Sequence, residues 1–193
     1  MQKPKKIRKK ALTVIELLSV ILILGLLFAA IFQALIAGQL ANVLGLEKIY
    51  LQTDTRRLLD WLVKDLRSTQ ASEFSDNTSI NYIRFRKVKG YNTSATNYIW
   101  EDNYTEYSYD NLTQTITRRI INVTTGNITG SWTFYNISAA PFYTRNSTGS
   151  INPLDKEGIL HNRNLVLNIS SFSQKRNVNL TFSLNEEVRI RNP

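Results

Sequence analysis

Few side chains in this sequence are of the types that commonly perform catalysis or bind metals. The 193 residues include no Cys and one His, His161. Without Cys there are no disulfides, thiolate metal sites or cysteine nucleophiles, and a single imidazole excludes a histidine-rich zinc site. A Ser-His-Asp triad could form only around His161, and no nucleophile motif, glycine-rich phosphate loop or dinucleotide fingerprint accompanies it. We therefore expect a protein that is not an enzyme and that holds no metal or cofactor.

One carboxylate is notable for its position. Glu16 is the only charged residue between Leu12 and Leu46. A carboxylate just inside the hydrocarbon of a bilayer costs roughly 2.5–3.5 kcal/mol, so a membrane segment that keeps one should give it a partner. Thr13 and Glu16 also match the Thr-x-x-Glu capping box, which stabilises a helix start by hydrogen bonds alone. Pairing with a partner and capping the helix are compatible roles for Glu16, and only the pairing needs a second molecule.

The element that must position Glu16 is a long apolar helix. Residues 17–46 carry no charge, and at ~1.5 Å per residue about 20 helical residues span a bilayer core. A buried helix of a soluble protein is the alternative, which the charges flanking this run disfavour. We therefore expect a membrane anchor, in which the following residues contact lipid: Leu17, Ile21, Leu24, Gly25, Phe28 and Ile31.

Basic residues precede the apolar run. Residues 1–11 contain six Lys or Arg and no acid. By the positive-inside rule the amino end is cytoplasmic, and the chain crosses the cytoplasmic membrane once, with its remainder outside. The net charge of +9 first suggests a nucleic-acid partner. Removing these eleven residues, however, leaves 18 basic and 15 acidic side chains, and this balance is too mild to indicate one.

Three interpretations of this amino end compete: a secretory signal, a plain anchor and a short cleaved leader. A secretory signal would be cut near Ala37–Gly38, after bulky Leu35 and Ile36 and an overlong apolar region, which fits poorly. A plain anchor explains the apolar run but gives Glu16 no role.

The run Lys9-Lys10-Ala11-Leu12-Thr13-Val14-Ile15-Glu16-Leu17-Leu18 resembles the class III leader junction of type IV pilins and pseudopilins. The resemblance implies cleavage between Ala11 and Leu12 by a membrane prepilin peptidase, which then methylates the Leu12 amine. Ala11 replaces the commoner Gly, and Leu12 the commoner Phe. The resemblance further implies that Glu16 pairs with the Leu12 amine of a neighbouring subunit in a growing filament.

Shorter resemblances extend into the rest of the chain. Asp65-Leu66-Arg67, the Tyr109–Arg118 hairpin and the terminal Val188–Asn192 are similar to W-type minor pilins and J-type pseudopilins. Major pilins, which form the shaft, commonly have a Pro near the position of Gln33 and a carboxyl-terminal disulfide loop. This chain has neither, so the resemblance favours a minor pilin or pseudopilin over a shaft subunit. The partners that the resemblance implies are other pilin-like subunits, the prepilin peptidase, the lipid bilayer and a membrane assembly platform driven by a cytoplasmic ATPase. The final location would be an extracellular or envelope-spanning filament.

Residue patterns divide the chain into four segments. These are a cleaved basic leader (1–11), a transmembrane and assembly half-helix (12–46), an amphipathic half-helix (47–72) and an exposed β-rich domain (73–193). In the amphipathic part, helical periodicity continues from Glu47 to about Gln70. Its apolar stripe is formed by Leu51, Leu58, Leu62 and Leu66, with Leu59, Trp61 and Val63 at its edges. The other side is expected to carry solvated charges, namely Asp54, Arg57, Asp60, Lys64 and Asp65.

From residue 77 onward the apolar pattern has a period of two, which indicates half-buried strands. The cleanest alternation is Val178/Leu180/Phe182/Leu184. Asp110-Asn111 is expected to be the turn of a hairpin between strands 104–109 and 112–121, and residues 138–161 to be irregular. We therefore predict an α+β fold of pilin-like layout, in which one antiparallel sheet packs on the second half of the long helix.

Asparagine is frequent in the predicted β-rich domain. Chance would place roughly four of its 18 asparagines in Asn-x-Ser/Thr triplets. Ten occur: Asn77, Asn92, Asn103, Asn111, Asn122, Asn127, Asn136, Asn146, Asn168 and Asn179. One interpretation is N-glycosylation, which would indicate an archaeal envelope. The other is a polar strand face, because residues i and i+2 point the same way in a strand.

Two other classes of function remain open. Arg84 and Arg86 share one face of a predicted strand with aromatic residues nearby, as in surfaces that bind single-stranded nucleic acid. The same charges also protect an exposed strand from edge pairing, and we favour this second explanation. A single-pass, membrane-anchored adhesin or DNA-binding surface protein that does not polymerise is thus the alternative to a filament subunit.

Overall fold

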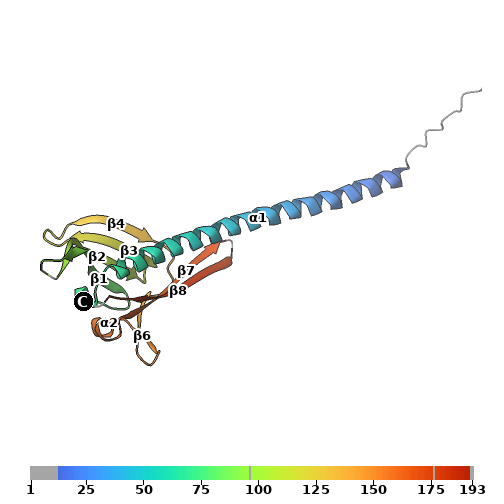
Figure 1. Cartoon of the computed structure of the whole chain (residues 1–193). Coiled ribbons are helices and arrows are strands. Elements are labelled where there is room, and N and C mark those ends of the chain that lie inside the picture. The colour runs from blue at the N-terminus through green and yellow to red at the C-terminus, as the bar shows by residue number, and fades with distance from the viewer. Residues whose placement is uncertain (1–12, 96, 176, 192–193) are drawn as a thin grey trace, which may run out of the picture. The chain divides into compact units, whose positions relative to one another are not determined.

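The computed structural model describes residues 13–95, 97–175 and 177–191 (Figure 1). The junction between Ala11 and Leu12 lies outside the described residues. The chain divides into two compact units, Met1–Gly45 and Leu46–Pro193. Each unit is described by itself.

The described residues form two α-helices, one short 3₁₀ helix and eight strands. In chain order these are α1 (Val14–Arg67), η1 (Ala71–Glu73), β1 (Tyr82–Asn92), β2 (Asn97–Asp110), β3 (Thr115–Asn122), β4 (Ile128–Phe134), β5 (Phe142–Arg145), β6 (Ile151–Pro153), α2 (Lys156–Asn162), β7 (Asn164–Lys175) and β8 (Val178–Arg189). The predicted α+β class and the long apolar amino-terminal helix are confirmed. The prediction of a single sheet is wrong, because the strands form two antiparallel sheets.

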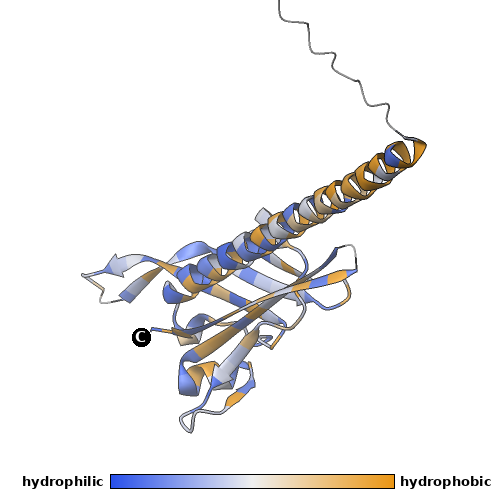
Figure 2. Cartoon of the chain, turned by 90° about the vertical axis from the view of Figure 1, so that its right-hand side faces the viewer, coloured by the Kyte–Doolittle hydropathy of each residue, from blue (hydrophilic) through white to orange (hydrophobic). Residues whose placement is uncertain are grey.

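Helix α1 changes character along its length, as the hydropathy colours of Figure 2 show. In the first unit it is almost entirely apolar. In the second unit its inward side chains are buried, and Leu58, Leu62 and Leu66 have no exposed surface. The predicted apolar stripe is therefore confirmed. The helix ends at Arg67, before the end of the predicted half-helix (47–72), and the Ser68 hydroxyl donates there to the Asp65 carbonyl at 2.7 Å.

The first sheet has the order β1-β2-β3-β4, with every neighbouring pair antiparallel. The predicted hairpin is confirmed by the antiparallel pairing of β2 with β3, but its turn covers Asn111–Gln114 and not Asp110-Asn111. Asp110 begins this turn by accepting hydrogen bonds from the Leu112 amide (2.9 Å) and the Thr113 hydroxyl (2.8 Å), which lower the pKa of its carboxyl. Leu112 is consequently 94% exposed in the turn and does not belong to the apolar face of the strand.

The second sheet has the order β6-β5-β7-β8. The chain reaches it through residues 135–138, which run beside β7, with the Phe172 amide donating to the Asn136 carbonyl at 2.7 Å. The prediction that residues 138–161 are irregular is wrong, since they contain β5, β6 and most of α2. These elements have four, three and seven residues, too few to show a period in the sequence. The predicted strand at 178–184 is confirmed as part of β8, whose apolar side chains are mostly half-buried at the sheet edge.

One core joins the second half of α1 to both sheets. Its fully buried members include Leu58 and Leu62 from the helix, Ile83 and Phe85 from the first sheet, and Leu167 from the second. Polar contacts also reach the second sheet from α1. The Thr55 hydroxyl donates to Ser171 Oγ at 2.8 Å, and Ser173 Oγ donates to Glu47 Oε1 at 2.8 Å. This part of α1 is therefore held by side chains of both sheets.

Candidate functional site

The start of α1 has the hydrogen bonds of a capped helix. The Thr13 amide and hydroxyl both donate to Glu16 Oε2, at 2.9 and 3.0 Å. In return the Thr13 carbonyl accepts from the amides of Glu16 (3.1 Å) and Leu17 (3.2 Å). The capping role predicted for Glu16 is thus present in the structure. Its carboxylate is exposed in the first turn, where the positive end of the helix dipole favours it.

An exposed apolar surface follows directly after this carboxylate. The predicted anchor side chains are between 46% exposed at Leu24 and 68% exposed at Phe28, and no atom lies within 4 Å of a Cβ built on Gly25. Helix α1 is long and apolar enough to cross a membrane, and no residue in its most apolar 18-residue stretch is buried. Soluble monomers rarely expose apolar patches of this size, so the segment requires lipid or another protein around it.

A cluster of charged side chains is buried where the second half of α1 meets the first sheet. Asp65, from α1, accepts on Oδ2 from Arg118 of β3, at 3.0 Å from Nε and 2.9 Å from the terminal nitrogen. The same oxygen accepts from the Tyr107 hydroxyl at 2.8 Å, and Oδ1 accepts from Lys87 at 3.3 Å. The Arg118 side chain is only 11% exposed, and its carboxylate partner only 8%. The hydrogen bonds compensate for the removal of both charges from water.

Aromatic rings surround the buried guanidinium group. The central carbon of Arg118 lies 4.9 Å from the ring centroid of Trp132 and 5.2 Å from that of Trp61. The two indole rings meet edge to face, with their centroids 5.6 Å apart. Cation–π attraction of this kind is strengthened where water is excluded. The rings therefore hold Arg118 in the position from which it binds Asp65.

Tyr107 is the neutral member of this cluster. Burial raises the pKa of its hydroxyl far above the ordinary value, and the nearby Asp65 carboxylate raises it further, although Arg118 acts in the opposite direction. The hydroxyl therefore stays protonated and donates to Asp65, while it accepts from Arg118 Nε at 3.0 Å.

This pKa shift predicts a loss of stability in alkali. Above the unfolded-state value of about 10, the unfolded chain releases the Tyr107 proton while the folded chain keeps it. Ionisation of Tyr107 in the unfolded chain then lowers the free energy of unfolding by up to about 1.4 kcal/mol per pH unit. Tyr107→Phe should lower stability at pH 7, by removing a donor to Asp65, but should show a shallower decline above pH 10. Urea unfolding followed by Trp fluorescence measures both effects.

The control for this experiment is Tyr135→Phe, because Tyr135 is 68% exposed. It should unfold with the pH profile of the wild type. If Tyr107→Phe shows the wild-type decline as well, the Tyr107 proton does not contribute to the pH dependence.

The prediction that Asp65 is a solvated helix charge is wrong. A signal for its burial is present in the sequence, because Leu51, Thr55, Leu58, Leu62 and Asp65 are spaced by four, three, four and three residues. This spacing keeps all five on one helix face, and all five are buried. The prediction of an exposed Asp65 was based on residue type alone, because aspartate is usually found at the surface. The roles of Tyr107 and Lys87 had no signal in the sequence, and Arg118 was singled out only as the end of the resembling segment Tyr109–Arg118.

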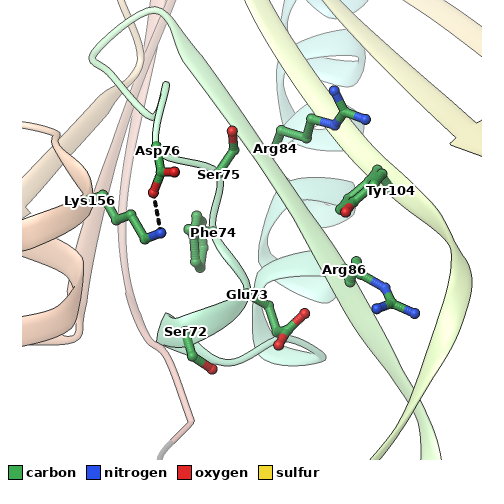
Figure 3. A pocket seen from close by; sticks show the side chains of 9 residues that line it. All are labelled: Ser72, Glu73, Phe74, Ser75, Asp76, Arg84, Arg86, Tyr104 and Lys156. Atoms are coloured by element: carbon green, nitrogen blue, oxygen red, sulfur yellow. Dashed lines mark hydrogen bonds and ion pairs between the residues drawn. The ribbon is translucent and has the colours of Figure 1, made fainter. Parts of the chain in front are cut away.

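A polar cavity of about 390 Å³ includes the two arginines considered for nucleic-acid binding (Figure 3). Arg84 lies over the Tyr104 ring, 4.2 Å from its centroid, and Arg86 donates to the Glu101 carbonyl at 3.1 and 3.2 Å. On the other side of the cavity Lys156 pairs with Asp76. The carboxylates of Glu73 and Asp76 also line this space, so its charge is mixed and poorly suited to a phosphate backbone.

The Asn-x-Ser/Thr asparagines are all accessible. Six are exposed, namely Asn77, Asn92, Asn111, Asn127, Asn136 and Asn179, and four are half-buried, namely Asn103, Asn122, Asn146 and Asn168. His161 lies in the last turn of α2, where Nδ1 is 2.8 Å from the Glu157 carbonyl. Among the described residues, no group of three or more His, Asp or Glu is placed to hold a metal ion.

Comparisons with protein-family models, with curated proteins and with solved structures find no match for this chain. The sites described above therefore have to be interpreted by their own chemistry. The first is a capped carboxylate beside an apolar helix surface, which suits contact with lipid and with a cation from another chain. The second is a buried ion pair, which suits fastening the helix to a sheet.

Proposed function

We propose that this chain is a minor pilin-like or pseudopilin subunit of a type IV pilus or of a type II secretion-like filament. The observation that carries the proposal is the position of Glu16. It is a carboxylate in the first turn of α1, between a basic leader that ends at Ala11-Leu12 and an apolar helix surface that has no cover within the described residues. A cut leader and a retained helix would give all three features a role together, whereas a plain anchor uses the basic residues and the apolar run but leaves the Glu16 charge without a partner from another chain.

The proposal accounts for the apolar surface in two stages. Before assembly, lipid covers the helix from Leu17 onward, and the six cations of the leader hold the amino end in the cytoplasm. After the cut, the Leu12 amine becomes a cation close to Glu16. In a filament, the amine of one subunit and the carboxylate of the next would satisfy each other, and packed helices would replace the lipid.

The carboxyl-terminal unit supports the same proposal. Its half-helix lies on antiparallel sheets, a layout compatible with that of pilins. Two of the short resembling segments also meet in space. Asp65, from Asp65-Leu66-Arg67, binds Arg118, from Tyr109–Arg118, at 2.9 Å.

Mass spectrometry of the amino end of the native protein tests the proposal. We expect the mature chain to begin at Leu12 with one methyl group on its amine. Ala11→Leu replaces the small residue before the cut and should retain residues 1–11. A native chain that begins at Met1 would instead indicate an anchored adhesin or DNA-binding protein that does not polymerise, and one that begins at Gly38 would indicate secretion.

A further inference from the structure

We propose that the Leu46–Pro193 unit is N-glycosylated at its Asn-x-Ser/Thr triplets, and that the triplets are modified before the unit folds. This inference is independent of the filament proposal. It rests on where the structure places the ten triplets and on one buried hydroxyl group.

The polar-strand explanation of the triplets accounts for few of them. Both the asparagine and the hydroxyl residue lie in the same strand only for Asn103/Thr105, Asn168/Ser170 and Asn179/Thr181. The other seven triplets begin at the last residue of a strand or outside the strands. Strand periodicity therefore does not produce the excess of triplets.

Turn formation explains some of the asparagines but not the hydroxyl residues. The side-chain oxygens of Asn92, Asn122 and Asn146 accept from the amide two residues later, at 3.0 to 3.1 Å. This Asx turn needs no hydroxyl at that later position. Of the ten triplet hydroxyls, only that of Thr148 donates to the asparagine of its own triplet within the described residues.

The reactive atoms are accessible in every triplet. None of the ten asparagine side chains is buried, and none of their Nδ2 atoms donates a hydrogen bond to the described part of the chain. Where the side-chain oxygen is held in a turn, the nitrogen on the same carbon is left to carry a glycan. A glycan on the six exposed asparagines would project into solvent without displacing the core.

Thr105 supplies the observation on timing. Thr105 is 1% exposed, and its buried hydroxyl has no hydrogen-bond partner in the described part of the chain. A buried unpaired hydroxyl destabilises a fold, and valine has the same shape without this defect. Folding therefore gives no reason for threonine at this position, whereas the triplet Asn103-Tyr104-Thr105 does. A transferase could recognise this hydroxyl only before the strand is buried.

The chemistry is transfer of a sugar from a lipid-linked donor, a glycan attached to a polyisoprenyl phosphate or diphosphate. The asparagine Nδ2 forms a bond to the anomeric carbon, and the bond from that carbon to the phosphate oxygen breaks. The lipid phosphate leaves with the bonding electrons, and the amide proton passes to a base. No oxidant or reductant is needed.

Site mapping by mass spectrometry of the native, full-length protein is the main test. We expect glycan on the exposed triplet asparagines, such as Asn92, Asn111 and Asn136. The matched controls are Asn81, Asn97 and Asn185, which are exposed but have no hydroxyl residue two positions later, and these should be unmodified. A native protein with the plain polypeptide mass, or with sugar only on Ser and Thr, overturns the proposal.

Thr105→Val tests the timing. We expect this variant to lose the glycan of Asn103, and hence the mass of one glycan, while its thermal unfolding temperature stays equal or rises. Thr105→Ser should keep some modification of Asn103. If Asn103 carries no glycan in the wild type while exposed triplets do, modification follows folding and this part of the proposal is wrong.

Discussion

Replacing Asp65 with alanine should lower the free energy of unfolding of this protein by about 3–5 kcal/mol, the range typical when one partner of a buried ion pair is removed. The carboxylate is 8% exposed and accepts from Arg118, Lys87 and Tyr107. Without it, Arg118 has no carboxylate at hydrogen-bond distance within the described residues, and Lys87 keeps only Glu101, at 3.5 Å. Urea unfolding of the full-length chain in detergent, followed by the fluorescence of Trp61 and Trp132, measures the loss.

An exposed ion pair between the last residue of α1 and β8 provides the control. Arg67 and Glu186 approach to 3.8 Å, with side chains 65% and 42% exposed. Since exposed pairs are typically worth about 0–1 kcal/mol, Glu186→Ala should change stability by less than about 1 kcal/mol. A similar loss for Glu186→Ala and Asp65→Ala would contradict the importance of burial.

A double variant separates the ion pair from simple loss of packing. In Asp65→Ala/Arg118→Met, the uncompensated charge of Arg118 disappears, and methionine can fill the space between Trp61 and Trp132. We expect the double variant to be more stable than the sum of the two single changes predicts, by about 0.5–3 kcal/mol. Strict additivity would indicate that the two side chains act separately.

In this chain, sequence patterns predict well which face of a helix or strand is buried. They predict poorly which strands pair with one another. The stripe containing Leu58 and Leu62 lies on the core because helical periodicity reports burial directly. The alternation Val178/Leu180/Phe182/Leu184 likewise identifies a strand. Neither pattern contains information about which strands pair, so the division into two sheets was not predictable.

The errors in side-chain placement also have physical causes. Asp65 has a surface-type side chain at a position that helical geometry buries, and only its distant partners make this burial tolerable. Leu112 is apolar but lies in a turn, where the hydrogen bonds to Asp110 fix the backbone whatever the side chain prefers. In both cases contacts made by the backbone or by distant residues outweigh residue type. Glu16 could be identified because its surroundings are local, within four residues of Thr13.

The second large effect that we expect is a loss of filament incorporation when the charge of Glu16 is removed. Glu16→Gln removes the charge but retains a side-chain oxygen that can accept from the Thr13 amide, so the helix start remains capped. Membrane insertion should be unchanged or improved, because a charge near the hydrocarbon is removed. Incorporation into filaments should fall at least about tenfold, since a hydrogen bond to a charged group contributes roughly 1.5–3 kcal/mol.

Comparison of the membrane fraction with sheared filaments, both probed for this chain, measures the two effects separately. Ser19→Ala is the control, because it changes a neighbouring polar side chain that donates to the backbone carbonyls of Ile15 (2.6 Å) and Glu16 (3.1 Å) and leaves the Glu16 carboxylate in place. It should insert and assemble as the wild type does. Glu16→Ala, which removes cap and charge together, should assemble no better than Glu16→Gln. If Glu16→Gln assembles normally and only Glu16→Ala fails, helix capping alone explains the carboxylate, and pairing with the Leu12 amine of another subunit is not needed.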